Sequence, residues 1–240
     1  MKILLCAELC TLTMQENLQK IIDTVNAHHA DFYVFGEAFL QGFDALTFEY
    51  KYDITVAISE NDFAIAAIKK LAREKKCAIG FGFYENDKGA IYSSYMVIDK
   101  TGAQCFKYQR ISTGWKIASA CADYREGKNF GTFLLEDKVF SCFLCGDFWE
   151  DSLLEKIAAL DVHVNAFLWP VHCDYSVAKW EGGECAEYQK RTAILAKPVF
   201  FCNNYCADFN AAKGGAYVWK QGKALATLAS GYPDCLSFEF

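Results

Sequence analysis

Short apolar runs alternate along the chain with segments in which apolar residues recur at helical spacing. After a run at residues 3–7, Leu18, Ile21, Ile22 and Val25 fall on one face of a helix. The same spacing returns over residues 65–72, after Ser59, Asn61 and Asp62 as candidate caps. The predicted strands are 3–7, 31–36, 77–83, 91–98, 104–111, one near Phe133, one near Val139, 162–168, 199–203, 216–220 and 236–240. The predicted helices are 18–25, 65–72, 153–160 and 184–195.

This mixed order, with hairpins in the middle, predicts an α/β protein in which helices cover layered sheets. The order alone leaves open a doubly wound sheet and a sandwich of two sheets. The chain contains 3 prolines and no low-complexity linker, so residues 1–240 are expected to form a single domain. No glycine-rich loop follows the first strand, which argues against nucleotide binding.

The charge and hydropathy patterns exclude several kinds of partner. The net charge is −6 and no basic block is present, so nucleic acid is not expected to bind. The apolar runs are too short to span a membrane. The apolar stretch at the N-terminus is also too short for a secretory signal and is interpreted as a strand. A cytoplasmic protein is therefore expected.

The 12 cysteines are scattered through the sequence, and several lie within apolar runs. Most are expected to be reduced and to serve as small core residues. Cys142 and Cys145, and likewise Cys202 and Cys206, form close pairs, but neither has a second pair at zinc-site spacing. In a strand, Cys142 and Cys145 would face opposite sides. No metal or organic cofactor is expected.

Cys145 ends an apolar run and is followed by Gly146 and Asp147. A thiol at the end of a strand can face a cleft while its backbone is held, and the glycine lets backbone N–H groups approach a ligand. This local architecture suits a cysteine nucleophile. Glu37 directly follows another apolar strand, at the position where α/β proteins place ligand sites, and is a candidate general base.

Cations and histidines add further candidates. Lys107 and Arg110 lie near a strand end, where a cation can stabilise an oxyanion, although solvated edge charges are the favoured explanation when the two residues are taken alone. Of the four histidines, His28 and His29 are expected at the surface and His163 in a buried strand. His172 follows Trp169-Pro170 in a loop, so a Cys145–His172 dyad is an alternative to a glutamate base.

Three segments resemble the nitrilase superfamily of carbon–nitrogen hydrolases. They are residues 34–43 around Glu37, residues 144–150 around Cys145, and residues 190–203, which end at a strand closed by Asn203. The order and spacing of these segments extend over nearly the whole chain. The resemblance implies a four-layer αββα sandwich, a Glu-Lys-Cys triad, and a homodimer or higher homo-oligomer.

The chain departs from the family pattern at the cation. Counted from Gly102, the position of the family's lysine falls on Arg110. Arginine can hold an oxyanion with its planar fork, but it does not readily give up a proton. Lys107 or Lys116 in a shifted register are the alternatives. Asp123 or Glu126 could supply the second acid that the family often carries, and the sequence does not decide between them.

The resemblance therefore predicts a hydrolase that cleaves a small amide or carbamoyl compound through a thioester, with Glu37, Arg110 and Cys145 as the catalytic residues. The residues expected to shape the substrate pocket are Trp115, Gly146, Phe148, Trp149, Trp169 and His172. Two alternatives stay open: a catalytically impaired protein that binds a small ligand in the same cleft, and a thiol redox sensor.

Overall fold

The computed structural model describes residues 1–208 and 211–240 and contains two six-stranded sheets. The first sheet has the order β12-β1-β2-β3-β4-β5 and the second the order β11-β10-β9-β8-β7-β6. The first sheet consists of β1 (Lys2–Ala7), β2 (Phe32–Phe35), β3 (Ala78–Asp87), β4 (Ala90–Ile98), β5 (Gln104–Gln109) and β12 (Asp234–Glu239). The second consists of β6 (Thr132–Leu135), β7 (Lys138–Cys142), β8 (Ala166–Val171), β9 (Val199–Asn203), β10 (Ala216–Lys220) and β11 (Lys223–Leu228).

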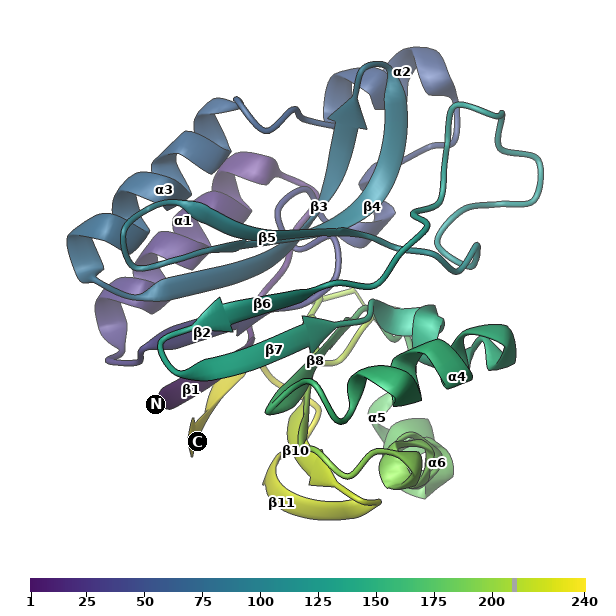
Figure 1. Ribbon diagram of the computed structural model, residues 1–240. Coiled ribbons are helices and arrows are strands. Elements are labelled where there is room, and N and C mark those ends of the chain that lie inside the picture. Colours follow the sequence, from purple (N-terminus) through teal and green to yellow (C-terminus); the bar gives the residue numbers. More distant parts are fainter. Residues whose placement is uncertain (209–210) are drawn as a thin grey trace.

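Helices cover the outer face of each sheet. Figure 1 shows α1 (Met14–Ala27) and α3 (Phe63–Lys75) along the first sheet, and α4 (Asp151–Leu160) and α6 (Cys185–Arg191) beside the second. The remaining helices are short: α2 (Tyr50–Val56) and α5 (Val177–Lys179). Asp62 precedes helix α3 and its side chain accepts a hydrogen bond from the Ala64 N–H, so one of the three predicted cap residues does cap the helix.

The alternation of side chains along β1 shows how the layers are built. Ile3, Leu5 and Ala7 point into a core between the two sheets, which also contains Phe140 of β7. Leu4 and Cys6 point to the other side, into a core shared with α1 and α3. A third core lies between the second sheet and α4 and α6. A buried strand with apolar residues on both faces requires a layer on each side. The fold is thus the expected four-layer αββα sandwich.

The sequence-based assignment differs from the structure in a few places. The predicted strand at 162–168 begins only at Ala166, because Val162 and His163 lie exposed in a turn. The interpretation of His163 as a residue of a buried strand is therefore wrong. Helix α2 and strand β11 were not predicted. His28 and His29 are exposed, as expected.

All twelve cysteines carry free thiols, and Cys6, Cys10, Cys77, Cys142, Cys173 and Cys202 are buried. Half of them thus serve as the small core residues expected from the sequence. Cys142 lies between the sheets, whereas Cys145 contacts the outer core of the second sheet, so the two thiols face different layers. Among the described residues, no helix is long and apolar enough to cross a membrane.

Candidate active site

Several polar side chains lie just beyond the carboxyl ends of strands. Glu37 follows β2 and Arg110 follows β5, both in the first sheet. Cys145 comes three residues after β7, His172 follows β8 and Asn204 follows β9, all in the second sheet. Strands β7, β8 and β9 are parallel, as are β1, β2 and β3, and ligand sites of α/β proteins form at such strand ends. The topology therefore brings residues far apart in the sequence to one place.

Glu37 and Arg110 form an ion pair in the protein interior. Arg110 Nη1 donates to Glu37 Oε1 at 2.8 Å, and their side chains are 3% and 0% exposed, respectively. The Ser93 hydroxyl donates to the same oxygen at 2.9 Å, whereas the buried Glu37 Oε2 has no hydrogen-bond partner among the described residues. Burial acts to lower the pKa of Arg110, but the Glu37 carboxylate, with Cys145 and Asp147 nearby, outweighs burial and raises it. Arg110 is thus a permanent cation.

The cysteine lies at a strained turn. Cys145 has φ +40°, which is uncommon for a residue with a side chain, and it begins a short 3-10 turn that ends at Trp149. The indole Nε1 of Trp169 donates to the Cys145 carbonyl at 2.9 Å. The Cys145 thiol faces the backbone carbonyl of His172, with Sγ and O 3.9 Å apart. These contacts hold the backbone of Cys145 in place.

Asp147 joins the cysteine turn to the segment that carries Arg110. Its carboxylate accepts hydrogen bonds from the Leu144 N–H at 2.9 Å, the Ser112 N–H at 2.7 Å, the Ile111 N–H at 3.1 Å and the Tyr108 hydroxyl at 2.6 Å. Burial is the largest influence on Asp147 and raises its pKa, although these donors and Arg110 act in the opposite direction. One buried carboxylate therefore fixes the position of Cys145 relative to Arg110.

The guanidinium of Arg110 lies against Gly146. A Cβ atom placed on Gly146 would be 2.3 Å from Arg110 Nη2, so only glycine permits this approach. A cavity of about 250 Å³ opens beside these groups and is lined by Phe43, Asp44, Arg110, Gly114, Cys145, His172 and Asp174. Cys145 and Arg110 thus face the same space.

The second sheet also supports the glutamate. Asn204 Nδ2 donates to the Glu37 carbonyl at 2.7 Å and lies 3.3 Å from His172 Nδ1. Gly36 allows this contact, because a Cβ atom there would be 2.1 Å from Asn204 Oδ1. The imidazole of His172 is stacked on Phe43 at 4.5 Å between ring centroids, and it faces Asn204 and Asp44 rather than the Cys145 thiol.

Neither alternative cation lines the cavity at Cys145, although Lys116 lines a hollow that adjoins it. Lys107 binds Glu60 and Glu85 and lines a separate surface hollow together with Glu126. Lys116 donates to the Tyr124 carbonyl at 2.6 Å and pairs with Glu126 at 2.6 Å. The chain therefore places Arg110 beside Glu37 and Cys145, and the lysines in other ion pairs.

The candidate second acids are also engaged away from Cys145. Glu126 is held by Lys116, and Asp123 is half exposed, with its carboxylate 4.0 Å from Arg125 Nη2. Neither lines the cavity at Cys145.

The predicted aromatic pocket residues divide into two groups. Phe148 and Trp169 are fully buried beneath the cysteine turn, and Trp149 is 39% exposed and meets Tyr188 edge to face. None of these three lines the Cys145 cavity. Trp115 lines an adjoining hollow of about 300 Å³ that shares Phe43, Asp44 and Gly114 with that cavity. His172 is the one predicted pocket side chain that lines the Cys145 cavity directly.

Sequence reasoning missed Ser93, Asn204, Asp44 and Asp174, and it gave no role to Asp147. Asn204 had a local signal, since it directly follows a buried strand. Ser93 had none, because it lies inside β4 and meets Glu37 only through strand pairing.

Comparison with known proteins agrees with this architecture. A model of the carbon-nitrogen hydrolase family matches residues 7–158, which is more than half of the chain. The chain belongs to this family, so the resemblance noted from its motifs is confirmed. A search of curated protein sequences gave no match.

Solved structures of similar fold include amidases from Nesterenkonia. One is a mutant of the amidase from Nesterenkonia sp. AN1 that carries acrylamide added to its active site cysteine. It is 16% identical, with 100% of this chain and 93% of that chain covered and a TM-score of 0.81. Another is a mutant of the same amidase in complex with butyramide, 17% identical, with coverage of 99% and 89% and a TM-score of 0.79. This likeness confirms the fold.

Proposed function

We propose that this chain is a cysteine-dependent amidohydrolase that cleaves the C–N bond of a small amide or carbamoyl compound. The observation that carries the proposal is the common cavity of Cys145 and Arg110, with Glu37 bound to that arginine at 2.8 Å. A nucleophile, a base and an oxyanion stabiliser are the groups that acyl transfer requires. Membership in the carbon-nitrogen hydrolase family supports the reaction class.

In the first half of the reaction, Glu37 takes the thiol proton of Cys145, and the sulfur bonds to the carbonyl carbon of the substrate. The unpartnered Oε2 of Glu37 is the free position for that proton. Arg110 and the backbone N–H near Gly146 stabilise the oxyanion, and one such donor is typically worth about 10²–10³-fold in rate. Glu37 then returns the proton to the leaving nitrogen as the C–N bond breaks, which yields a thioester.

In the second half, Glu37 takes a proton from water, and the hydroxide attacks the thioester carbon. The C–S bond breaks, the carboxylic acid leaves, and the proton returns to the Cys145 sulfur. Because Arg110 keeps its proton throughout, it acts by charge and hydrogen bonding alone. This division of work assigns all proton transfer to Glu37.

The test is a turnover assay on a panel of short amides and carbamoyl compounds, in which ammonia release and the intact mass of the protein are followed. We expect ammonia release by the wild-type protein and none by Cys145→Ala. We also expect a transient acyl adduct on Cys145 of the wild-type protein, and neither adduct nor ammonia release with Glu37→Gln, because Glu37 carries the proton transfers of both halves. The absence of both turnover and a Cys145-dependent adduct would contradict the proposal.

A second candidate function is ligand binding without turnover, and the engagement of Glu37 by Arg110 and Ser93 favours it. Calorimetric binding of an amide by a wild-type protein that releases no ammonia would support it. The third candidate, a thiol sensor, gains little from Cys142 and Cys145, because these thiols face different layers. Sulfenate or disulfide formation at either residue under mild oxidant, without turnover, would support the sensor.

We further propose that residues 1–240 form one domain, because the central core draws side chains from both sheets. A single cooperative unfolding transition tests this.

We also propose the homo-oligomer that the resemblance implies, with a homodimer as the first expectation. Light scattering on the purified protein tests the oligomeric state. The free thiols fit a reducing compartment, which supports a cytoplasmic location that cell fractionation can check.

A further inference from the structure

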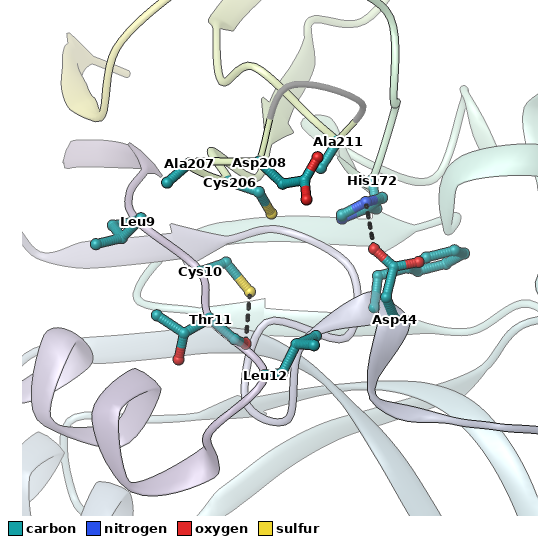
Figure 2. A pocket seen from close by; sticks show the side chains of 12 residues that line it. Leu9, Cys10, Thr11, Leu12, Asp44, His172, Cys206, Ala207, Asp208 and Ala211 are labelled. Carbon is teal, nitrogen blue, oxygen red and sulfur yellow. Dashed lines mark hydrogen bonds and ion pairs between the residues drawn. The ribbon is translucent and has the colours of Figure 1, made fainter.

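The cavity at Cys145 adjoins a larger hollow. That hollow has a volume of about 510 Å³ and shares Phe43, Asp44 and His172 with the Cys145 cavity. Figure 2 shows its lining, with Asp44 and His172 facing each other and Cys10 and Cys206 on the opposite wall. A substrate bound at Cys145 therefore has room to extend past Asp44.

The charges around this space do not balance. Asp44 and Asp174 line the Cys145 cavity, and Asp44 also lines the larger hollow. Among the described residues, Arg110 is the one arginine or lysine that lines either space, and Glu37 already neutralises it. His172 adds no compensating charge at neutral pH, because burial lowers its pKa. The combined space is therefore negative.

A buried donor faces the same space. The side chain of His172 is only 3% exposed, and its Nδ1 lies 3.3 Å from Asn204 Nδ2. Asn204 Nδ2 is a donor, since it also donates to the Glu37 carbonyl. His172 Nδ1 therefore accepts a hydrogen bond from Asn204, and the proton of the neutral imidazole is on His172 Nε2. Nε2 is 4.0 Å from Asp44 Oδ2, beyond hydrogen-bond distance, so within residues 1–208 and 211–240 this N–H is left to bind a ligand.

We propose that the substrate is a short amide that carries a cationic group, an ammonium or a guanidinium, on the side away from the scissile bond. This inference rests on the proposed amidohydrolase function and names its substrate class. The amide carbon lies at Cys145, the His172 Nε2–H binds an uncharged acceptor atom, and the cation lies between Asp44 and Asp174. Substrates that end in a carboxylate are repelled by the same aspartates.

The experiment uses three amides of similar length and different charge: 4-aminobutanamide, pentanamide and succinamate. We expect kcat/KM to fall in that order, by about tenfold per step at low ionic strength, at the lower end of the effect that charged clefts exert. Added salt should shrink the differences, since both aspartates are exposed at the rim. Asp44→Asn and Asp174→Asn should each reduce the ratio of 4-aminobutanamide to pentanamide several-fold.

Asp137→Asn is the matched control, because Asp137 is an exposed aspartate that lines neither hollow. It should leave the ratio unchanged. Equal or better use of pentanamide, or a ratio unaffected by both Asn variants, would overturn the proposal. If no amide is turned over, the proposed hydrolase fails. The charge preference is then read from calorimetric titration of Cys145→Ala, and equal or absent binding of the three ligands overturns it.

Discussion

Arg110 and Glu37 share a hydrogen bond of 2.8 Å inside the protein, so the cation and the candidate base of this site form one unit. Both side chains are almost fully buried, so each charge is stabilised mainly by the other. The arginine therefore cannot be considered apart from the glutamate that it holds.

Removal of either charge should destabilise the fold. Arg110→Met leaves the Glu37 carboxylate buried without its cation, and Glu37→Gln leaves the guanidinium without its anion. A broken buried pair costs about 3–5 kcal/mol in the free energy of unfolding. The double variant should lose clearly less than the sum of the two single losses. Urea denaturation of the four proteins measures this coupling, and additive losses would show that the pair is not a unit.

Gly146→Ala should abolish most activity while the protein stays folded. The new Cβ would displace the Arg110 guanidinium, which lies 2.3 Å from its position. On the proposed mechanism, this removes an oxyanion donor and lowers kcat by about 10²–10³-fold. Gly182→Ala is the control, because no atom of the residues that the structure describes lies within 4 Å of a Cβ there. Near-UV circular dichroism of both variants checks the fold, and an active Gly146→Ala protein would contradict the role of Arg110.

Asp147→Asn should destabilise the protein and displace the cysteine turn. The asparagine NH₂ would face donors that now bind a carboxylate, and an unsatisfied buried donor costs about 1–3 kcal/mol. Tyr108→Phe removes only one of the four donors of Asp147 and should cost less. Chemical denaturation ranks the two variants, and the opposite order would mean that the backbone contacts of Asp147 matter little.

Stability should fall as the pH drops below about 6.5, the ordinary pKa of histidine. Burial lowers the pKa of His172 in the folded protein, although Asp44, Glu37 and Asp174 act to raise it. Above pH ~6.5, His172 is neutral in both states and has no effect. Below it, the unfolded chain binds the proton first, so unfolding is favoured until the folded protein also becomes protonated.

Thermal unfolding of wild type and His172→Gln between pH 5 and pH 8, a range chosen to bracket about 6.5, measures this contribution. The variant should lose less stability on acidification than the wild type. His28→Gln, at an exposed site, should behave like the wild type. Parallel curves for all three proteins would mean that His172 does not titrate differently in the folded state.

Local patterns predicted most of the fold, because most strands are buried and most long helices have one apolar face. Helix α2 was not predicted because its one buried residue is the polar Asp53, so it has no apolar face. Hydrogen bonds from Thr47, Phe48 and Tyr124 hold the Asp53 carboxylate in place. Strand β11 was not predicted because it is a largely exposed edge strand. In both cases tertiary contacts, rather than periodicity, stabilise the element.

The site was predictable where strand ends mark it. Glu37 and Cys145 follow apolar runs, and the count from Gly102 placed Arg110, which the structure puts beside Glu37. The partners of these residues were not predictable, because they come from distant parts of the chain. Ser93 is 56 residues from Glu37 and Asn204 is 167 residues from it. Such pairings arise only when both sheets have formed.

The site also straddles the boundary between the two sheets. Glu37 and Arg110 belong to the first sheet, while Cys145, His172 and Asn204 belong to the second. Their distances therefore depend on how the two sheets pack on each other, through a core of mainly apolar side chains. On the proposed mechanism, the turnover rate therefore depends on the alignment of the two sheets. A substitution that creates a cavity in that core, for example Phe140→Ala, should lower the turnover rate even under conditions in which the protein stays folded.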